Sequence, residues 1–274
     1  MLKFIPLSSG SNGNCYVLYT ETDALMIDAG IGIRTLKKFC IQYNLSMKHV
    51  KHVLVTHDHA DHVKSVGKVS NAYSLPVYTT MEVYEGIGRN YCVTPKIQSE
   101  NVHCLEKNHS YQLGSFEVTP VAVPHDSTDC VGYKIKCQGI VFGLMTDVGH
   151  VTPELEQLIG EANYLVLEAN HDVEMVNNGP YPQHLKNRIL SPTGHLSNTD
   201  SATALVKNAT EQLQHVWLCH LSEENNHPIL VEKTFQTIFE QHGLRIGEDI
   251  KIEVLKRKVP TGIYVLSLPQ KQEK

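Results

Sequence analysis

Short apolar runs separated by polar, glycine-containing turns occupy the first half of the chain. Runs of this kind, bounded by turn-forming residues, are typical of strands. Leu36, Phe39 and Cys40 instead recur at helical spacing, which predicts a helix around them. The strands predicted in this half cover residues 3–7, 16–20, 24–28, 52–56 and 77–79. The helices predicted in this half cover residues 33–43, 60–69 and 81–88.

The second half of the chain begins with further strands and then alternates helix with strand. Gln138 and Gly139 form the turn of a predicted hairpin between two of these strands. The strands predicted here cover residues 101–106, 116–123, 131–137, 140–146, 164–168, 216–219, 250–256 and 262–268. The helices predicted here cover residues 153–158, 199–210 and 228–241.

Strands therefore cluster in each half of the chain and are interleaved with helices. Two sheets covered by outer helices fit this order, which predicts an α/β (α+β) protein with a four-layer αββα sandwich. The sequence contains no repeat, low-complexity stretch or linker. We therefore expect one domain over residues 1–274, with residues 268–274 as a frayed tail. Strand ends meet along one edge of such a sandwich, and we expect the functional site there.

The composition is that of an ordinary globular protein, with 41% hydrophobic and 19% charged residues. The net charge of −5 argues against a protein that coats nucleic acid without specificity. It does not exclude an enzyme that handles a polyanion through bound cations.

The sequence shows neither a signal peptide nor a run of about eighteen apolar residues, so we expect a cytoplasmic protein without a membrane span. Seven cysteines without a C-x-x-C pair indicate reduced thiols that pack as small apolar groups.

The sequence HDHADH at residues 57–62 follows the apolar run of residues 52–56. Imidazole and carboxylate groups bind borderline divalent metals, so this pattern predicts a transition-metal site at the end of a strand. Buried ionisable groups without such a partner would be costly. The pattern divides into two histidines and an Asp-His pair. This division suggests two metals that need further ligands from distant parts of the chain.

Three polar residues elsewhere in the chain each close an apolar run. They are His125, Asp147 and His220, and each stands at the end of a predicted strand. A lone histidine at a strand end is usually a surface residue. Three such endings in a chain that also carries the HDHADH pattern are instead typical of ligands that project from the edge of a buried sheet.

The order of these residues resembles the metallo-β-lactamase superfamily of binuclear hydrolases, over the region from Asp28 to about residue 226. The resemblance implies one metal site of three histidines, a second site of one aspartate and two histidines, and a bridging aspartate. In that order, these ligands are His57, His59 and His125, then Asp61, His62 and His220, and finally Asp147. The resemblance also implies that Asp28 orients a ligand histidine through a hydrogen bond. The alternative for Asp28 is a turn-forming residue before Gly30.

Five further motifs narrow the resemblance to the WalJ subfamily, also called YycJ or VicX. This subfamily is similar to tRNase Z and to the phosphodiesterases of phosphonate breakdown. The motifs are SSGSNGN at residues 8–14, TDVG at 146–149, EANHD at 168–172, GHLSN at 194–198 and HLSEENN at 220–226. A bridging aspartate separates this group from hydrolases whose second site uses cysteine.

His195 is the candidate for a catalytic group that does not bind metal, and Asp61 is counted as catalytic as well as a ligand. His195 precedes a predicted helix whose N-cap is expected at Asn198, and a helix N-terminus favours phosphate. The resemblance implies a position beside the scissile phosphate, where His195 would bind it or protonate the leaving oxygen. The alternative is a histidine in a capping turn.

Glu168 is expected to accept a hydrogen bond from a ligand or from His195, unless it is a buried structural carboxylate. His171 is expected to line the pocket or orient His195, with a simple loop role as the alternative.

Basic residues and tyrosines suggest a rim that contacts the substrate. The candidates for binding phosphate are Lys186, Arg188, Lys256, Arg257 and Lys258. Charges of this kind more often mark a solvated face, which is the alternative. Tyr91 and Tyr181 are candidates for stacking on bases.

These features together predict a metal-dependent phosphodiesterase. Two divalent metal ions, Zn or Mn before Fe or Ni, would share a water and lower its pKa for attack on phosphorus. The resemblance implies DNA as the phosphodiester substrate and an exonuclease as the type of enzyme. One alternative is a phosphodiesterase for a small cyclic phosphate or nucleotide. Another is a regulatory metal-binding protein linked to two-component signalling. The sequence leaves the oligomeric state open.

Overall fold

Two seven-stranded sheets form the centre of the protein. The structure is a computed structural model that describes residues 1–268, so residues 269–274 of the expected tail lie outside the described part. In spatial order, the first sheet contains β14 (Tyr264–Leu266), β1 (Leu2–Ser8), β2 (Cys15–Tyr19), β3 (Ala24–Ile27), β4 (Val50–Leu54), β5 (Val77–Thr79) and β6 (Val102–Cys104). The second sheet contains β13 (Lys251–Val254), β12 (His215–Cys219), β11 (Tyr164–Glu168), β10 (Ile140–Met145), β9 (Val131–Cys137), β8 (Phe116–Ala122) and β7 (Tyr111–Leu113).

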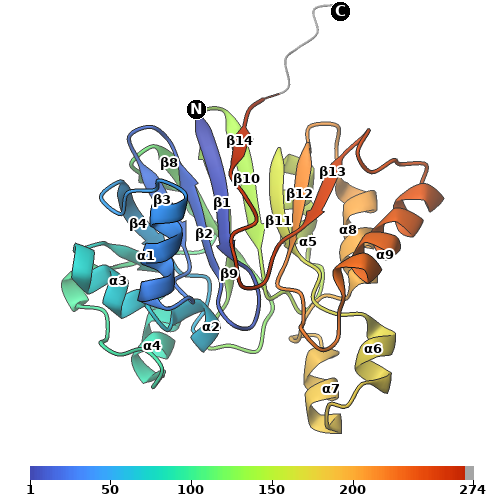
Figure 1. Cartoon of the computed structure of the whole chain (residues 1–274), viewed down its shortest axis with the longest axis horizontal. Helices are drawn as coiled ribbons and strands as arrows, with labels where there is room; N and C mark the ends of the chain where they lie inside the picture. The colour runs from blue at the N-terminus through green and yellow to red at the C-terminus, as the bar shows by residue number, and fades with distance from the viewer. Residues whose placement is uncertain (269–274) are drawn as a thin grey trace, which may run out of the picture.

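Helices cover the outer face of each sheet. On the first sheet these are α1 (Ile33–Gln42), α2 (Ala60–Val63), α3 (Val66–Tyr73) and α4 (Met81–Arg89). On the second sheet they are α5 (Pro153–Glu161), α8 (Asn198–Asn208) and α9 (Pro228–Gln241). Figure 1 shows the two sheets between these two helical flanks, so the predicted four-layer αββα sandwich is confirmed. Within residues 1–268, none of the helices combines the length and apolarity needed to span a bilayer.

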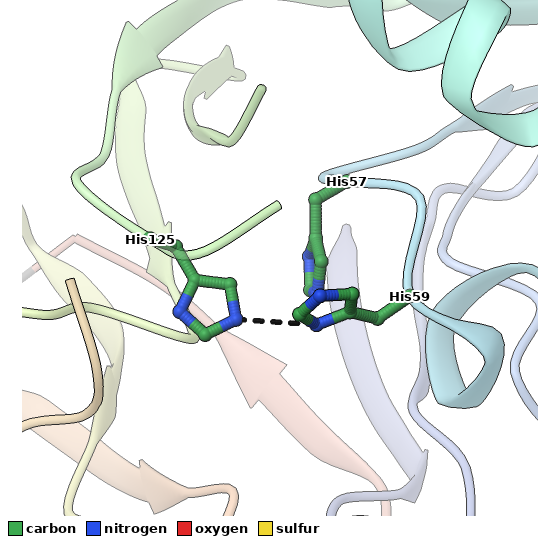
Figure 2. A group of neighbouring side chains, drawn as sticks. All are labelled: His57, His59 and His125. Carbon is green, nitrogen blue, oxygen red and sulfur yellow. Dashed lines mark hydrogen bonds between the residues drawn. The ribbon is translucent and has the colours of Figure 1, made fainter. Parts of the chain in front are cut away.

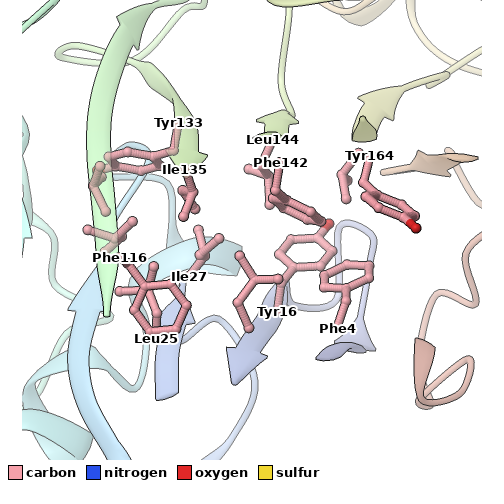
Figure 3. Close-up of a cluster of buried hydrophobic side chains, with 14 of the residues drawn as sticks. Phe4, Tyr16, Leu25, Ile27, Phe116, Tyr133, Ile135, Phe142, Leu144 and Tyr164 are labelled. Carbon is pink, nitrogen blue, oxygen red and sulfur yellow. The ribbon is translucent and has the colours of Figure 1, made fainter. Parts of the chain in front are cut away.

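The core has three parts because side chains alternate between the two faces of each strand. Along β3, Leu25 and Ile27 join the cluster between the sheets, whereas Ala24 and Met26 join the cluster beneath the helices. Figure 3 shows the inter-sheet cluster, in which large side chains of β1 to β3 meet those of β8 to β11. The central strands β2, β3, β10 and β11 are therefore buried almost entirely on both faces.

Several strand ends lie at one edge of the sandwich as a result of strand direction. β3, β4, β5 and β6 run parallel in the first sheet, and β10, β11, β12 and β13 run parallel in the second. β8 points the same way as β10 because both are antiparallel to β9. The loops that follow these strands therefore meet at the same edge, as the sequence predicts.

The predicted helix over residues 60–69 is wrong in one respect, because it is divided into α2 and α3. The amide of Ser65 donates to the carbonyl of Ala29 at the end of β3, at 3.0 Å, instead of continuing the helix. The amide of Ala29 in turn donates to the carbonyl of His62, at 2.9 Å. These long-range bonds fix the short helix α2 against the end of β3, and local periodicity could not reveal them.

Other differences from the predicted elements lie in the second half of the chain. The sequence pattern missed β7, α6 (Val173–Asn178) and α7 (Gln183–Ile189), which contain only 3, 6 and 7 residues. The N-cap of α8 is Ser197, whose hydroxyl accepts from the amide of Asp200, so the expected cap at Asn198 is one residue late. β14 pairs with β1, so the last strand returns to the sheet formed by the first half.

Candidate metal centre

The residues expected to bind metal come from loops at the shared edge. Those from the first half follow β4 or lie in α2, and they are His57, His59, Asp61 and His62. Those from the second half directly follow or closely follow β8, β10 and β12, and they are His125, Asp147 and His220. Asp28 follows β3 in the same way. The structure thus brings together every residue of the predicted ligand set.

Three of these strand-end residues have a left-handed backbone. The φ angles are 59° at Asp28, 56° at Asp147 and 53° at His220. Such a conformation costs roughly 1–2 kcal/mol for a residue with a Cβ, and it is commonest at short polar residues such as aspartate. It turns the chain sharply at the end of each strand. The side chain then points into the edge of the sandwich instead of continuing along the sheet.

Three histidines form the first group of possible ligands. His57, His59 and His125 each offer one ring nitrogen, and these nitrogens all lie within 4.8 Å of one another. Figure 2 shows the three rings turned toward a common point, with His59 Nδ1 at 3.2 Å from His125 Nε2. His57 Nε2 is buried, and residues 1–268 supply no hydrogen-bond partner for it. An orphaned imidazole nitrogen facing two others fits a divalent metal, which binds neutral imidazole.

Further groups of possible ligands adjoin the first. One contains Asp61, His62 and His220, another contains His57, His62 and Asp147, and a third contains Asp147, Glu168, His195 and His220. Asp147 occurs in two of these groups and contacts histidines of both halves of the cluster, with Oδ1 at 3.7 Å from His125 Nε2 and Oδ2 at 3.2 Å from His62 Nε2. Its Oδ1 also lies 3.3 Å from His220 Nδ1. The clusters form one continuous site, in which Asp147 has a central position.

The buried site holds its titratable groups in defined charge states. Burial lowers the pKa of His57 well below its usual value, with the neighbouring His62 adding to the effect, so this ring is neutral. Burial also lowers the pKa of His62, but the carboxylates of Asp147, Asp28 and Asp61 outweigh it and raise that pKa to about 10. The carboxylates therefore attract positive charge into the site, and a bound cation would satisfy them in place of the proton.

Asp28 fixes His62, one of the possible ligands, through a buried network. Its Oδ1 accepts from the Thr56 amide at 2.9 Å, and its Oδ2 accepts from the Thr56 hydroxyl at 2.9 Å. The same Oδ2 lies 2.7 Å from His62 Nδ1. An ionised carboxylate only accepts, so Nδ1 carries the proton and Nε2 faces the cluster. This geometry is the one expected for a residue that orients a ligand.

The Asp28→Asn variant is expected to bind divalent metal about 10- to 100-fold more weakly. Asparagine tolerates the left-handed backbone. Its NH₂ group, however, would replace one carboxylate oxygen and face a donor of Thr56 or His62 instead of accepting from it. Metal affinity is measured by competition with a coloured chelator, with thermal unfolding of the chelator-treated protein as the control for folding. Unchanged affinity in a folded variant would show that Asp28 serves only the turn.

Glu168 is a buried carboxylate with every hydrogen bond directed at the site or its supporting loops. Oε1 lies 2.9 Å from His195 Nδ1 and 3.0 Å from His220 Nδ1. Oε2 accepts from the amides of Val148 and Leu196, at 2.8 and 3.0 Å. Burial alone would raise the pKa of Glu168, but His195 and the hydrogen bonds from both histidines lower it to about 2. The side chain is therefore an anion that positions two imidazoles at once.

His195 lies between the two halves of the cluster. Its ring centre is 5.0 Å from that of His125 and 5.3 Å from that of His220. Because Glu168 engages Nδ1, Nε2 is the nitrogen available to a substrate. Burial lowers the pKa of His195, but Glu168 and Asp147 outweigh it and raise that pKa above its usual value. A histidine that holds its proton in this way suits a general acid.

His171 is a buried residue close to the site. Its side chain is 2% exposed, and burial lowers its pKa to about 4. The described residues supply no partner for its Nδ1, and its backbone carbonyl accepts from the amide of Asn198 at 2.9 Å. The backbone of His171 therefore bonds to the first residue of α8, while Glu168 contacts His195 Nδ1. The role of the His171 side chain stays a prediction.

Two polar residues of the site were not singled out from the sequence. Asn14 Nδ2 lies 2.8 Å from His62 Nε2 and 3.3 Å from Asp61 Oδ2. Asp126 Oδ1 lies 3.5 Å from His125 Nε2 and 3.9 Å from His59 Nε2. The glycine-containing motif at residues 8–14 was the available signal for Asn14. The backbone of Asn14 is held between Asp61 and Gly30: its amide donates to the Asp61 carbonyl at 2.7 Å, and its carbonyl accepts from the Gly30 amide at 2.9 Å.

The basic residues expected at a rim have different partners. The Arg257 guanidinium donates to the carbonyls of residues 221, 222 and 226, so it holds the loop after His220. Lys258 pairs with Glu223 at 2.6 Å, and Lys186 donates to the carbonyl of residue 177 at 2.7 Å. Nε and Nη2 of Arg257 therefore serve the fold, and its role at a rim stays a prediction. Arg188 pairs with Asp126 beside the first group of histidines.

Imidazole and carboxylate donors gathered at the strand ends of an αββα sandwich define a metal-dependent hydrolase. The chain belongs to the β-lactamase superfamily, since the family described as "Beta-lactamase superfamily domain" matches residues 24–220. This membership confirms the family resemblance and the enzyme class predicted from the sequence.

Relatives similar over most of the chain include two proteins named as exodeoxyribonucleases. Exodeoxyribonuclease YycJ of Bacillus anthracis is 33% identical over 262 residues, which is 96% of this chain and 98% of the relative. Exodeoxyribonuclease WalJ of Streptococcus pneumoniae is 31% identical over 250 residues, covering 91% of this chain and 93% of the relative. Zn(2+)-bound PqqB from Methylobacterium extorquens has a similar fold, with a TM-score of 0.71 at 16% identity, covering 96% of this chain and all of that one.

Proposed function

We propose that the protein is a metal-dependent phosphodiesterase that acts on DNA as an exonuclease. The observation that carries the proposal is the continuous site of imidazoles and carboxylates, in which His195 and its partner Glu168 adjoin the possible metal ligands. A cluster of this kind suits a reaction at phosphorus. It offers cation sites for the non-bridging oxygens and a proton donor for the leaving oxygen.

The proposed ligands are those expected from the sequence. His57, His59 and His125 would hold one divalent ion, and Asp61, His62 and His220 would hold a second. Asp147 would contact both, consistent with its Oδ1 at 3.7 Å from His125 Nε2 of the first set and its Oδ2 at 3.2 Å from His62 Nε2 of the second. Divalent ions bound there would lower the pKa of a water and neutralise charge on the phosphate.

The other side chains supply positioning and proton transfer. Asp28 would keep His62 in one orientation. Glu168 would hold His195 Nδ1, so that His195 Nε2 presents its proton toward the oxygen that leaves phosphorus. The nucleophile is a water, and no covalent link to the chain is needed.

The proposed DNA substrate is supported by the relatives. Both proteins named as exodeoxyribonucleases match this chain over more than nine-tenths of their own length. A small cyclic phosphate or nucleotide remains the competing substrate, since it would use the same cluster. Hydrolysis of bis-p-nitrophenyl phosphate measures the shared chemistry, and degradation of end-labelled single- and double-stranded DNA distinguishes the two substrates.

The Asp61→Ala variant tests whether the chemistry depends on the metal cluster. We expect it to hydrolyse bis-p-nitrophenyl phosphate at least about 10²-fold more slowly than the parent, because Asp61 carries one of the charges that would hold a cation. The Glu224→Ala variant removes a carboxylate outside the predicted ligand set and serves as the control. Full activity of Asp61→Ala with Zn or Mn would rule out the proposed mechanism with two metals.

A further inference from the structure

The pair formed by Arg188 and Asp126 has no role in the chemistry proposed above. Arg188 lies on α7, and its Nε and Nη2 donate to the two carboxylate oxygens of Asp126, the latter at 3.0 Å. Asp126 Oδ1 is in turn 3.5 Å from His125 Nε2 and 3.9 Å from His59 Nε2. Only one carboxylate therefore separates the guanidinium from the first histidine group.

The pair is poorly explained as a contribution to stability. The side chain of Arg188 is 52% exposed, and ion pairs at such exposure contribute little to folding. Every residue of α7 retains some solvent exposure, so this helix adds little to the core. Figure 1 shows α6 and α7 projecting from the end of the sandwich where α2 also lies. The structure thus places the Arg188 guanidinium near the first histidine group, on a helix that packs weakly against the rest of the protein.

The geometry of the pair leaves Arg188 able to bind a second anion. A guanidinium has five N–H donors in a fixed plane, and Asp126 engages only those of Nε and Nη2. The two-point contact with Asp126 holds that plane in one orientation, which lowers the entropy lost when another anion binds. Phosphate is the anion that suits such a planar, half-exposed group.

Electrostatics also favour a phosphate at this position. The site contains the carboxylates of Asp61, Asp147 and Glu168, and the whole chain carries a net charge of −5. A substrate with several phosphates would be repelled by these charges outside the reach of the bound cations. Lys186, Lys258 and Arg257 bond elsewhere, whereas the partner of Arg188 is Asp126, which itself lies beside His125 and His59.

We propose that Arg188, held by Asp126, forms a subsite for a second phosphate of the substrate, next to the phosphate that is cleaved. The proposal rests on the phosphodiesterase function proposed above, and it adds a residue that would select substrates with more than one phosphate. The preferred substrate is a phosphodiester that carries a neighbouring phosphate, as in a nucleic-acid strand. A diester with a single phosphate would use the cluster alone.

Inhibition of bis-p-nitrophenyl phosphate hydrolysis tests the subsite without requiring DNA cleavage. Thymidine 3′,5′-bisphosphate and thymidine 5′-monophosphate are compared as inhibitors of the metal-loaded parent, Arg188→Gln and Lys186→Gln proteins. We expect the bisphosphate to inhibit the parent about 10-fold or more better than the monophosphate. That preference should fall below about 3-fold in Arg188→Gln and persist in Lys186→Gln, the same change on the same helix.

Three results would overturn the subsite. They are a parent without the preference, an Arg188→Gln variant that keeps it, and an Arg188→Gln variant that loses bound metal or hydrolyses the single-phosphate substrate much more slowly. The last result would make Arg188 a support for the metal centre. If the preference behaves as expected but the parent leaves labelled DNA intact, the DNA substrate is wrong and the subsite stands.

Discussion

Replacing Asp147 with asparagine is expected to lower the bound metal and to reduce kcat/KM by at least about 10³-fold. Asp147 is 1% exposed, and its two oxygens face His62 on one side and His220 on the other. The hydroxyl of Thr146 donates to Oδ2 at 2.6 Å and fixes the carboxylate. Asparagine keeps the size and tolerates the backbone φ of 56°, so the change removes mainly the negative charge.

Metal per chain, measured by elemental analysis after dialysis, and hydrolysis of bis-p-nitrophenyl phosphate report this effect together. The Asp249→Asn variant, which alters an exposed carboxylate bonded to Arg245, is the matched control. Parent-like metal content and activity in Asp147→Asn would mean that the centre of the cluster does not hold the cations.

Replacing His195 with alanine is expected to preserve bound metal and to reduce kcat by about 10²- to 10⁴-fold on DNA, the range for loss of a general acid. The reduction should be much smaller on bis-p-nitrophenyl phosphate, because p-nitrophenolate leaves without being protonated. This difference follows from the geometry, in which Glu168 holds Nδ1 and leaves Nε2 for the substrate.

The comparison between the two substrates separates the roles left open for His195. Equal loss on both substrates would indicate that His195 binds the phosphate instead of protonating the leaving group. Loss of metal would indicate that His195 is a ligand, as the group that it forms with Asp147, Glu168 and His220 allows. Either result would remove His195 from its proposed role.

The sequence predicts the framework of the site because the HDHADH pattern follows one apolar run and His125, Asp147 and His220 each close another. A strand with both faces buried can place polar groups only at its ends, so residues such as His125 and His220 stand out from the pattern. Glu168 is harder to interpret, since it is the last residue of a fully buried strand. Its two histidine partners come from later loops and are invisible to local analysis.

Contacts between distant segments account for what the sequence could not predict. The helix break at Ser65 depends on a carbonyl of β3, and Arg257 finds its partners in the loop after β12. Asp126 and Arg188 are 62 positions apart, and each is unremarkable alone. The role of a charged residue on a short helix such as α7 can be inferred only once its partner in the folded structure is known.

The possible ligands are divided between the two sheets, and this division links metal binding to the integrity of the sandwich. At the same edge, the amide of Val131 donates to the carbonyl of Thr56 at 3.0 Å, and His57 and Cys130 form an isolated bridge. A cation held by His57 and His125 would link the two sheets. It would stabilise the folded state by mass action, because it binds that state in preference to the unfolded chain. Metal supply would then govern how long the protein resists unfolding and proteolysis, in addition to its turnover.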